Sequence, residues 1–214
     1  MTPLNQQAYL YLQDLIQSDR LSYDQVYSET KLAKEIGISR TPFRDAIHRL
    51  AQEGYIDIIP SRGFRLHRLT RTDVIETFQV RSAIECYCTY QIALASQTPE
   101  ARLLFQSLRG LMSQLKRILE TSHSISEFCD YDFRFHQEII NFVQNRQFQE
   151  VFSTFHYRMR RLAQLSLAHE GRMEATYQEH LNILTALERG DADHIYKITL
   201  VHMETPKGIN LEDL

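Results

Sequence analysis

Glycine and proline are placed so unevenly along this chain that they divide it into two parts of different character. Residues 64–109 contain no glycine, and beyond residue 70 the apolar residues recur at helical spacing almost to the end of the chain. This pattern predicts long helices separated by short joints. We expect these helices at about 72–96, 99–121, 125–143, 147–168, 172–188 and 192–205.

The first 70 residues carry breakers at shorter intervals and predict shorter elements. Apolar residues at i, i+4, i+7 and i+8 predict a helix over 3–17. SETKLAKEI predicts a short helix over 28–36, which Gly37 ends because glycine readily takes the left-handed conformation that follows a helix. The predicted order is helix, helix, tight turn, helix and hairpin.

The third helix and the hairpin follow Gly37 almost at once. In SRTPFRDAIHRLAQEG, we expect Thr41 to cap the helix, Pro42 to occupy its first position and Gly54 to close it. YIDII and FRLHRL have strand-like residues and are joined by PSRG, in which Gly63 can supply a positive φ. This part of the chain therefore predicts a small helical unit with a β-hairpin.

Two observations place a domain boundary near residue 70. Thr70 and Asp73 have the spacing of a capping box, which marks the start of the helical part. Residues 1–70 hold 9 Lys+Arg and 8 Asp+Glu, a charge of +1, whereas residues 71–214 hold 15 and 19, a charge of −4. Residues 38–71 alone contain seven arginines against three acidic residues. We therefore expect two domains, 1–70 and 71–214, with a local basic surface on the first.

Charge and cysteine content restrict the cellular context. The formal net charge of −3 gives no overall basic excess that would attract nucleic acid or an anionic membrane. Cys86, Cys88 and Cys129 are too few, and odd in number, for a disulfide framework, which favours a reducing compartment. The N-terminus lacks a signal-peptide pattern, and no stretch approaches about 18 consecutive apolar residues. We expect a cytoplasmic protein with no membrane partner.

Two short helices joined by a glycine-containing turn have the sequence form of a helix-turn-helix, whose second helix lies in the major groove of DNA. Here that helix opens with Ser39, Arg40, Thr41 and Arg44. Arginine can donate two hydrogen bonds to guanine, Ser and Thr reach bases or phosphates, and a helix N-terminus attracts phosphate. Arg62, at the hairpin tip, suits a wing that follows the DNA backbone or enters the minor groove.

Four side chains in the second part have the types and spacing of a metal site. Asp132 and His136 are four residues apart, which places both on one face of a helix, one turn apart. His180 and His202 lie in two helices that the joint at Gly190 can fold into an antiparallel pair. One carboxylate and three imidazoles suit zinc, nickel or cobalt, or manganese if more oxygen ligands join. Spacing alone leaves open that each histidine is an ordinary core or surface residue.

The segment YSETKLAKEIGISRTPFRDAIHRLAQEGYIDIIPSRGFRLHRL resembles the winged helix-turn-helix of the GntR family of bacterial transcription regulators, over about residues 5–69. The resemblance implies that Gly63 lets the wing approach DNA closely. It also implies that the third helix faces DNA with Ser39, Arg40, Thr41, Arg44 and Arg49.

The segment departs from the family pattern in two places. Thr30 stands where many members carry an arginine that contacts DNA, so either the operator half-site differs or the contact moves to Lys31 or Lys34. LSYDQVYS replaces the usual Pro-Gly turn before this helix, so the loop geometry is expected to differ.

Residues 72–205 resemble the all-helical effector domain of the FadR subgroup, the FCD type, in the form that carries a metal. TDVIETFQVRSAIE is similar to its opening helix, DFRFHQEII to its DxxxH segment and EHLNILTALERGDADHIYKITLVHM to its final helix pair. The resemblance implies a divalent ion held by four ligands: Asp132, His136, His180 and His202. It also implies that a small carboxylate effector completes the coordination of this ion.

The same resemblance names effector-binding candidates. It implies that Arg81 helps to hold the effector, and it matches Asn145 to a frequent asparagine. Tyr177 lies one turn before His180 and is a candidate polar wall of the same pocket.

These observations predict a mainly α protein, with an N-terminal winged helix-turn-helix and a C-terminal all-α bundle, that regulates transcription in response to a small carboxylate. We expect a homodimer, because two recognition helices related by C2 symmetry read a palindromic operator with more area than one helix. In one rival hypothesis the metal ion itself is the signal. In a second rival hypothesis the chain is a metal-dependent hydrolase. No catalytic residue is assigned for it, because Glu179 points about 100° away from the adjacent His180 and the sequence has no HExxH motif to supply a general base.

Overall fold

The computed structural model describes residues 2–18 and 20–214, and it divides into two compact units. The first unit runs to Leu69 and includes the segment Thr154–Arg158, and the second comprises Thr70–Ser153 and Met159–Leu214. In the described part of the chain, no helix combines the length and the apolar character needed to cross a membrane.

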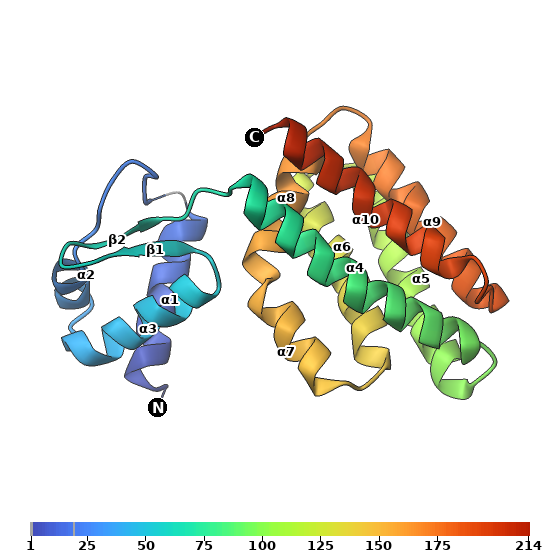
Figure 1. Cartoon of the computed structure of the whole chain (residues 1–214), viewed down its shortest axis with the longest axis horizontal. Helices are drawn as coiled ribbons and strands as arrows, with labels where there is room; N and C mark the ends of the chain where they lie inside the picture. The colour runs from blue at the N-terminus through green and yellow to red at the C-terminus, as the bar shows by residue number, and fades with distance from the viewer. Residues whose placement is uncertain (1, 19) are drawn as a thin grey trace. The chain divides into compact units, whose positions relative to one another are not determined.

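The first unit is three helices and a two-stranded antiparallel sheet (Figure 1). Its elements are α1 (Leu4–Gln17), α2 (Glu29–Glu35), α3 (Arg40–Gln52), β1 (Ile56–Ile59) and β2 (Gly63–Leu66). The strands pair in the register Ile56↔Leu66 to Ile59↔Gly63. One apolar core holds the unit together, and its fully buried side chains include Leu12, Phe43, Ile47, Leu50 and Phe64.

Helix α3 begins two residues earlier than the sequence indicated. Ser39 is its N-cap residue with extended backbone, so Thr41 and Pro42 both lie inside the first turn. Proline is tolerated there because the N–H groups of the first turn have no partner within the helix. The register matters for the surface, because it sets Arg40 and Arg44 one turn apart on the same face.

The hairpin turn uses two positive φ angles where the sequence suggested one. The Arg62 N–H donates to the Ile59 carbonyl at 3.0 Å, with Pro60 and then Ser61, at φ 60°, between them. Gly63 follows at φ 129°, and a Cβ on it would lie 1.9 Å from the carbonyl oxygen of Tyr27. The absent side chain therefore lets Tyr27 pair with the strand at Phe64, through hydrogen bonds of 2.7 and 3.1 Å.

The second unit is a helical bundle (Figure 1). Its helices are α4 (Arg71–Leu94), α5 (Pro99–Glu120), α6 (Ile125–Phe142), α7 (Arg146–Thr154), α8 (His156–Leu167), α9 (Arg172–Arg189) and α10 (Ile195–Glu212). The capping box at Thr70 and Asp73 is confirmed. Helix α4 packs along α10, where the buried hydroxyl groups of Thr89 and Thr199 lie 3.0 Å apart. Helices α5 and α6 pack together, and α9 packs on α4, α5 and α10.

Two helix boundaries differ from the predicted ones. The helix expected over 147–168 is divided at Phe155 into α7 and α8, in a stretch that contains neither glycine nor proline. The last helix was expected to end at 205 but runs through Pro206 to Glu212. The buried amide of Asn210 supports this segment by donating to the carbonyl of Pro206 at 2.8 Å and to that of Leu162 at 3.2 Å.

The close approach at Gly63 generates a stability prediction. Gly63→Ala should lower the free energy of unfolding by about 2–5 kcal/mol, because the new Cβ overlaps the Tyr27 carbonyl and the positive φ is strained. Gly37→Ala is the matched control: its φ is also positive at 66°, but a Cβ there has nothing within 4 Å, so about 1–2 kcal/mol is expected. Urea denaturation of the full chain, followed by circular dichroism, measures both. Equal losses would show that the approach of Tyr27 does not require the glycine.

Candidate metal centre and nucleic-acid interface

In the first unit, a groove of about 310 Å³ lies between α2, α3 and the hairpin. Arg40, Arg44 and His48 line it from one face of α3, at successive steps of four residues, and Arg62 lines it from the turn. All four side chains are exposed. Arg40 is only weakly restrained, with its Nε 3.9 Å from a carboxylate oxygen of Glu29. The groove is therefore a positively charged surface whose long side chains can reach outward.

The structure brings most, but not all, of the predicted DNA-contacting residues to this side of the unit. Ser39 and Thr41 are exposed in the opening turn of α3, beside Arg40 and Arg44. Arg49 is turned toward α1: its Nε lies 2.9 Å from Glu53, and its guanidinium lies 3.9 Å from the centre of the Tyr9 ring. The reason is helical geometry, since Arg49 is five residues beyond Arg44 and faces another direction.

Two further observations concern the same surface. Gly63 lines the groove, but the structure explains its missing side chain by the approach of Tyr27. Thr30, which stands where many family members carry an arginine, lines the groove. Lys31 and Lys34, the two lysines considered as alternative DNA contacts, are not among the residues that line it. Sequence reasoning missed His48, although its spacing of four from Arg44 was a usable signal.

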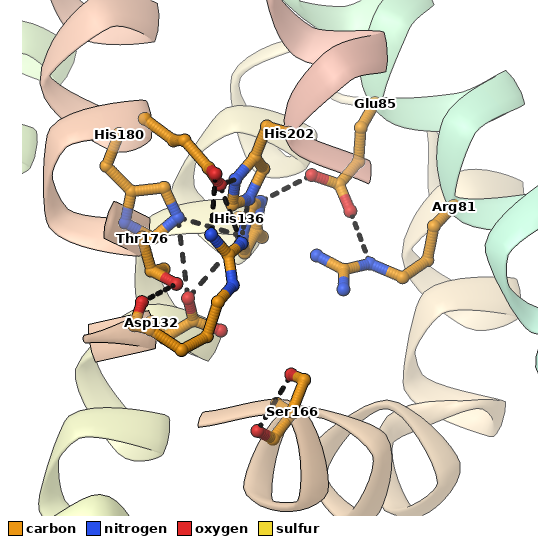
Figure 2. Close-up of polar contacts among 11 residues, drawn as sticks. Arg81, Glu85, Asp132, His136, Ser166, Thr176, His180 and His202 are labelled. Carbon is orange, nitrogen blue, oxygen red and sulfur yellow. Dashed lines mark hydrogen bonds and ion pairs between the residues drawn. The ribbon is translucent and has the colours of Figure 1, made fainter. Parts of the chain in front are cut away.

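In the second unit, three histidines from three helices converge on one point (Figure 2). His136 comes from α6, His180 from α9 and His202 from α10, and all three are buried. The Nε2 atom of His136 lies 3.2 Å from that of His180 and 3.3 Å from that of His202. Asp132, one turn before His136, places its Oδ1 3.4 Å from His180 Nε2 and 3.9 Å from His136 Nε2. Three ring nitrogens and one carboxylate oxygen therefore face a common centre.

Two glutamates, one buried and one partly buried, hold the far side of two of the histidine rings. Glu85 on α4 places its Oε2 2.5 Å from His136 Nδ1, and Glu179 places its Oε2 2.7 Å from His202 Nδ1. A carboxylate at Nδ1 holds the proton on that nitrogen, so the Nε2 lone pair points toward the centre. This arrangement prepares both imidazoles to act as metal ligands.

Each glutamate is in turn bound by a buried arginine. The Nε of Arg81 donates to Glu85 Oε1 at 2.8 Å, and the two terminal nitrogens of Arg172 donate to the carboxylate of Glu179 at 2.6 and 2.8 Å. The site therefore contains two parallel chains of arginine, glutamate and histidine, one anchored on α4 and one on α9 (Figure 2 labels the first).

The protonation states suit a cation. Burial acts to raise the pKa of Glu85, but Arg81 and His136 outweigh it and lower that pKa to about 2. Burial also acts to raise the pKa of Glu179, but the hydrogen bonds from Arg172 and His202 outweigh it and lower that pKa to about 2. Burial, followed by the neighbouring positive groups, lowers the pKa of His180 well below its usual value, and burial also lowers that of His202. Ionised carboxylates and neutral imidazoles are the forms that bind a divalent metal.

Two small cavities adjoin this centre, of about 20 and 10 Å³, and both are lined by Arg81, Asp132 and His136. Arg172 and Thr176 line the larger one. A cavity needs about 10–15 Å³ by this kind of measure to hold one water molecule, so each has room for roughly one.

The three predicted effector-binding residues do not all line the two cavities. Arg81 lies in both cavity walls. Asn145 lies outside the residues that line them and instead accepts hydrogen bonds at its Oδ1 from the N–H groups of Gln147 and Phe148, which caps the start of α7. Tyr177 is also outside the lining, because the cavity wall is formed by its neighbour Thr176, one turn before His180.

Sequence reasoning missed Glu85, Glu179 and Arg172 as parts of the site. The spacing of four between Arg81 and Glu85 was a signal, but such pairs usually lie on exposed helix faces, and only burial distinguishes this one.

Known proteins are similar to both units of the chain. Residues 4–66 match the family model described as bacterial regulatory proteins, gntR family, and residues 76–205 match that of the FCD domain. The HTH-type transcriptional repressor RspR of Escherichia coli (strain K12) is 25% identical over 202 residues, which cover 94% of this chain and 86% of RspR.

Solved structures share the fold. E. coli McbR/YncC superposes with a TM-score of 0.74 at 18% identity and covers 100% of this chain and 99% of its own. The metal-free FCD domain of TM0439 has a TM-score of 0.56 at 15% identity, and the match covers 68% of this chain and 96% of that one.

The glutamates that hold the histidines generate a prediction for metal binding. Glu85→Gln and Glu179→Gln should each weaken Zn²⁺ binding by about 10–100-fold, because a neutral amide orients the imidazole less strongly and makes it less basic. Competition of the purified protein with a chelator measures the affinity. Glu120→Gln, at an exposed position on α5, is the control and should leave it unchanged. Unaltered affinity in both variants would show that the glutamates do not support metal ligands.

Proposed function

The chain belongs to the GntR family of bacterial transcriptional regulators, in the form that carries an FCD domain, and we propose that a small carboxylate bound at a metal ion controls its affinity for operator DNA. The family and the similar proteins are regulators and not enzymes. The observation that carries the proposal is the convergence of three buried Nε2 atoms and one carboxylate oxygen on a single centre.

The DNA-binding part of the proposal rests on α3 and the hairpin. The opening turn of α3 enters the major groove, where Arg40 and Arg44 are long enough to reach base edges and Ser39 and Thr41 reach phosphates or bases. Arg62 follows the backbone or the minor groove from the hairpin turn. We propose that two copies act as a homodimer with C2 symmetry, because one recognition helix buries too little area for a specific complex.

The donor set of the second unit fits a divalent ion. Asp132, His136, His180 and His202 would hold it, and three imidazoles with one carboxylate favour zinc, with nickel, cobalt or manganese as alternatives. When bound, the ion supplies a Lewis-acid centre to which a carboxylate can coordinate. Arg81 lies in the wall of both adjoining cavities, where its guanidinium can bind the same carboxylate.

A second candidate function is regulation by the metal alone. The observation in its favour is the size of the two cavities beside Asp132 and His136, about 20 and 10 Å³, which have room for about one water molecule each. In that case the ion itself, by joining α6, α9 and α10, changes the bundle.

Substitution of the groove arginines tests the DNA interface. Arg44→Ala should weaken binding to an operator fragment, selected in vitro with the wild type, by roughly 5- to 150-fold, since one base contact contributes about 1–3 kcal/mol. Arg49→Ala is the matched control, because it removes an arginine from the same helix that faces α1. Fluorescence anisotropy measures both affinities, and thermal unfolding confirms that each variant is folded. The docking assignment is wrong if the two variants lose equal affinity.

Operator binding in three states separates the two candidate functions. The protein is compared in three states: metal-free, metal-loaded, and metal-loaded with a panel of carboxylates. Only the addition of a carboxylate should change the affinity for the selected operator, by about 5- to 150-fold. His180→Ala should lose the metal, measured by mass spectrometry of the dialysed protein, and lose the response. His169→Ala removes an exposed histidine from the same unit and should retain both. A response to metal loading alone, which no carboxylate enlarges, would establish the second candidate.

A further inference from the structure

A groove of about 610 Å³ runs between α9 and α10 of the second unit, apart from the two small cavities beside Asp132 and His136. The two helices are joined at Gly190 and pack against each other (Figure 1). Along α9 the lining extends from Glu179 to Arg189, which at 1.5 Å per residue is about 15 Å. Small-molecule sites have volumes of roughly 300–1,000 Å³. The groove therefore has the size of a site for an elongated small molecule.

The end of the groove near the joint carries an excess of positive charge. Arg189, in the last turn of α9, and Lys197, in the first turn of α10, line this end, and both are exposed. Neither side chain forms an ion pair with another described residue. The acid at this end, Asp191, is bound by His194, whose main-chain N–H donates to it at 3.2 Å and whose Nδ1 lies 2.8 Å away. Two cations against one carboxylate leave room for an anion.

The middle of the groove is apolar. Ala186 of α9 lines it together with Ile198 and Val201 of α10, and Val201 keeps 54% of its surface exposed. Asn182 adds one polar group, because its side-chain oxygen accepts from Gln178 at 3.1 Å while its amide nitrogen has no hydrogen-bond partner among the described residues. An apolar body laid over the three aliphatic side chains would remove their surface from water, which is favourable.

The far end of the groove offers no free cation. Glu179 and His202 line it, and these two side chains are bonded to each other at 2.7 Å. Arg172, which binds the same glutamate, is not among the residues that line the groove. Free positive charge in the described lining is therefore confined to the end near the joint, and an apolar surface leads away from it.

We propose that this groove binds an elongated organic anion with a single charged head. The head lies between Arg189 and Lys197, where charge-assisted hydrogen bonds orient it, and the apolar body lies over Ala186, Ile198 and Val201. Both cations and the valine are exposed, so the ligand reaches them directly from solvent. The site is separate from the proposed metal centre and requires no ion.

Fluorescence titration of the full chain with two probes tests the charged end. 8-Anilinonaphthalene-1-sulfonate combines an apolar ring system with one sulfonate, and N-phenyl-1-naphthylamine has the same rings without the charge. At low ionic strength, where screening is weak, Arg189→Gln combined with Lys197→Gln should raise the dissociation constant of the sulfonate by roughly 5- to 30-fold. The same variant should change that of the neutral probe by less than about 2-fold.

The matched control is Arg102→Gln combined with Lys116→Gln, which removes one arginine and one lysine from exposed positions on α5. This control carries the same change of net charge, and it should bind the sulfonate as the wild type does. Thermal unfolding checks that both double variants are folded.

A substitution in the apolar wall tests the rest of the groove. Val201→Asp places a carboxylate where the body of the ligand lies and should weaken binding of the sulfonate by about 10-fold or more. Leu103→Asp is its control, because Leu103 is 68% exposed on α5 and lies outside the groove. It should leave the affinity unchanged.

The outcomes separate this inference from the proposed function. Metal-free protein and protein loaded with one equivalent of Zn²⁺ should both bind the sulfonate. Binding only by the loaded protein would place the probe at the ion, which overturns the inference and leaves the proposed function standing. No binding by the wild type, or equal affinity of each groove variant and its α5 control, overturns the inference as well. A failure of metal loading or of the operator response bears on the proposed function alone.

Discussion

The two buried ion pairs between arginine and glutamate are the interactions on which the rest of the helical unit depends. A carboxylate in the interior is costly unless a positive group and hydrogen bonds compensate it, and loss of one partner of such a pair typically costs about 3–5 kcal/mol. Arg81 and Arg172 provide that compensation, so Glu85 and Glu179 remain ionised and can each hold a histidine ring. The contacts of these two glutamates with Nδ1 orient the rings of His136 and His202.

Burial has a second consequence for the histidines. His180 stacks on Phe135, with ring centres 4.3 Å apart, and has no surface exposure. An imidazolium there would be both desolvated and close to two arginines, so the neutral ring is favoured. The hydrophobic core thus selects the protonation state that a metal ligand needs, while the carboxylates select the tautomer.

The sequence predicted the fold well where local residues determine it. The glycines, the capping residues and the apolar spacing indicated the helix-turn-helix, the hairpin and most of the long helices. It failed at two places that carry no matching local signal: the break at Phe155 has no glycine or proline nearby, and the last helix continues through Pro206 to Glu212.

The candidate site divides in the same way. Spacing and the fold-back at Gly190 grouped Asp132, His136, His180 and His202 but left an ordinary role for each histidine open, and the family resemblance then favoured a metal site. The supporting residues were missed because an Arg and a Glu four residues apart look the same in sequence whether exposed or buried. Asn145 was matched to a frequent asparagine of the family, and its role as a cap of α7 became visible only from its hydrogen bonds.

The sequence separation of the converging histidines also orders events during synthesis. His136 and His202 are 66 positions apart, and His202 lies in α10, the last helix. A ribosome adds about 5–20 residues per second, so roughly 7–27 s pass between addition of Leu69, where the first segment of the winged unit ends, and addition of His202. For that interval the nascent chain holds α1, α2, α3 and the hairpin, while the bundle still lacks one of its converging nitrogens.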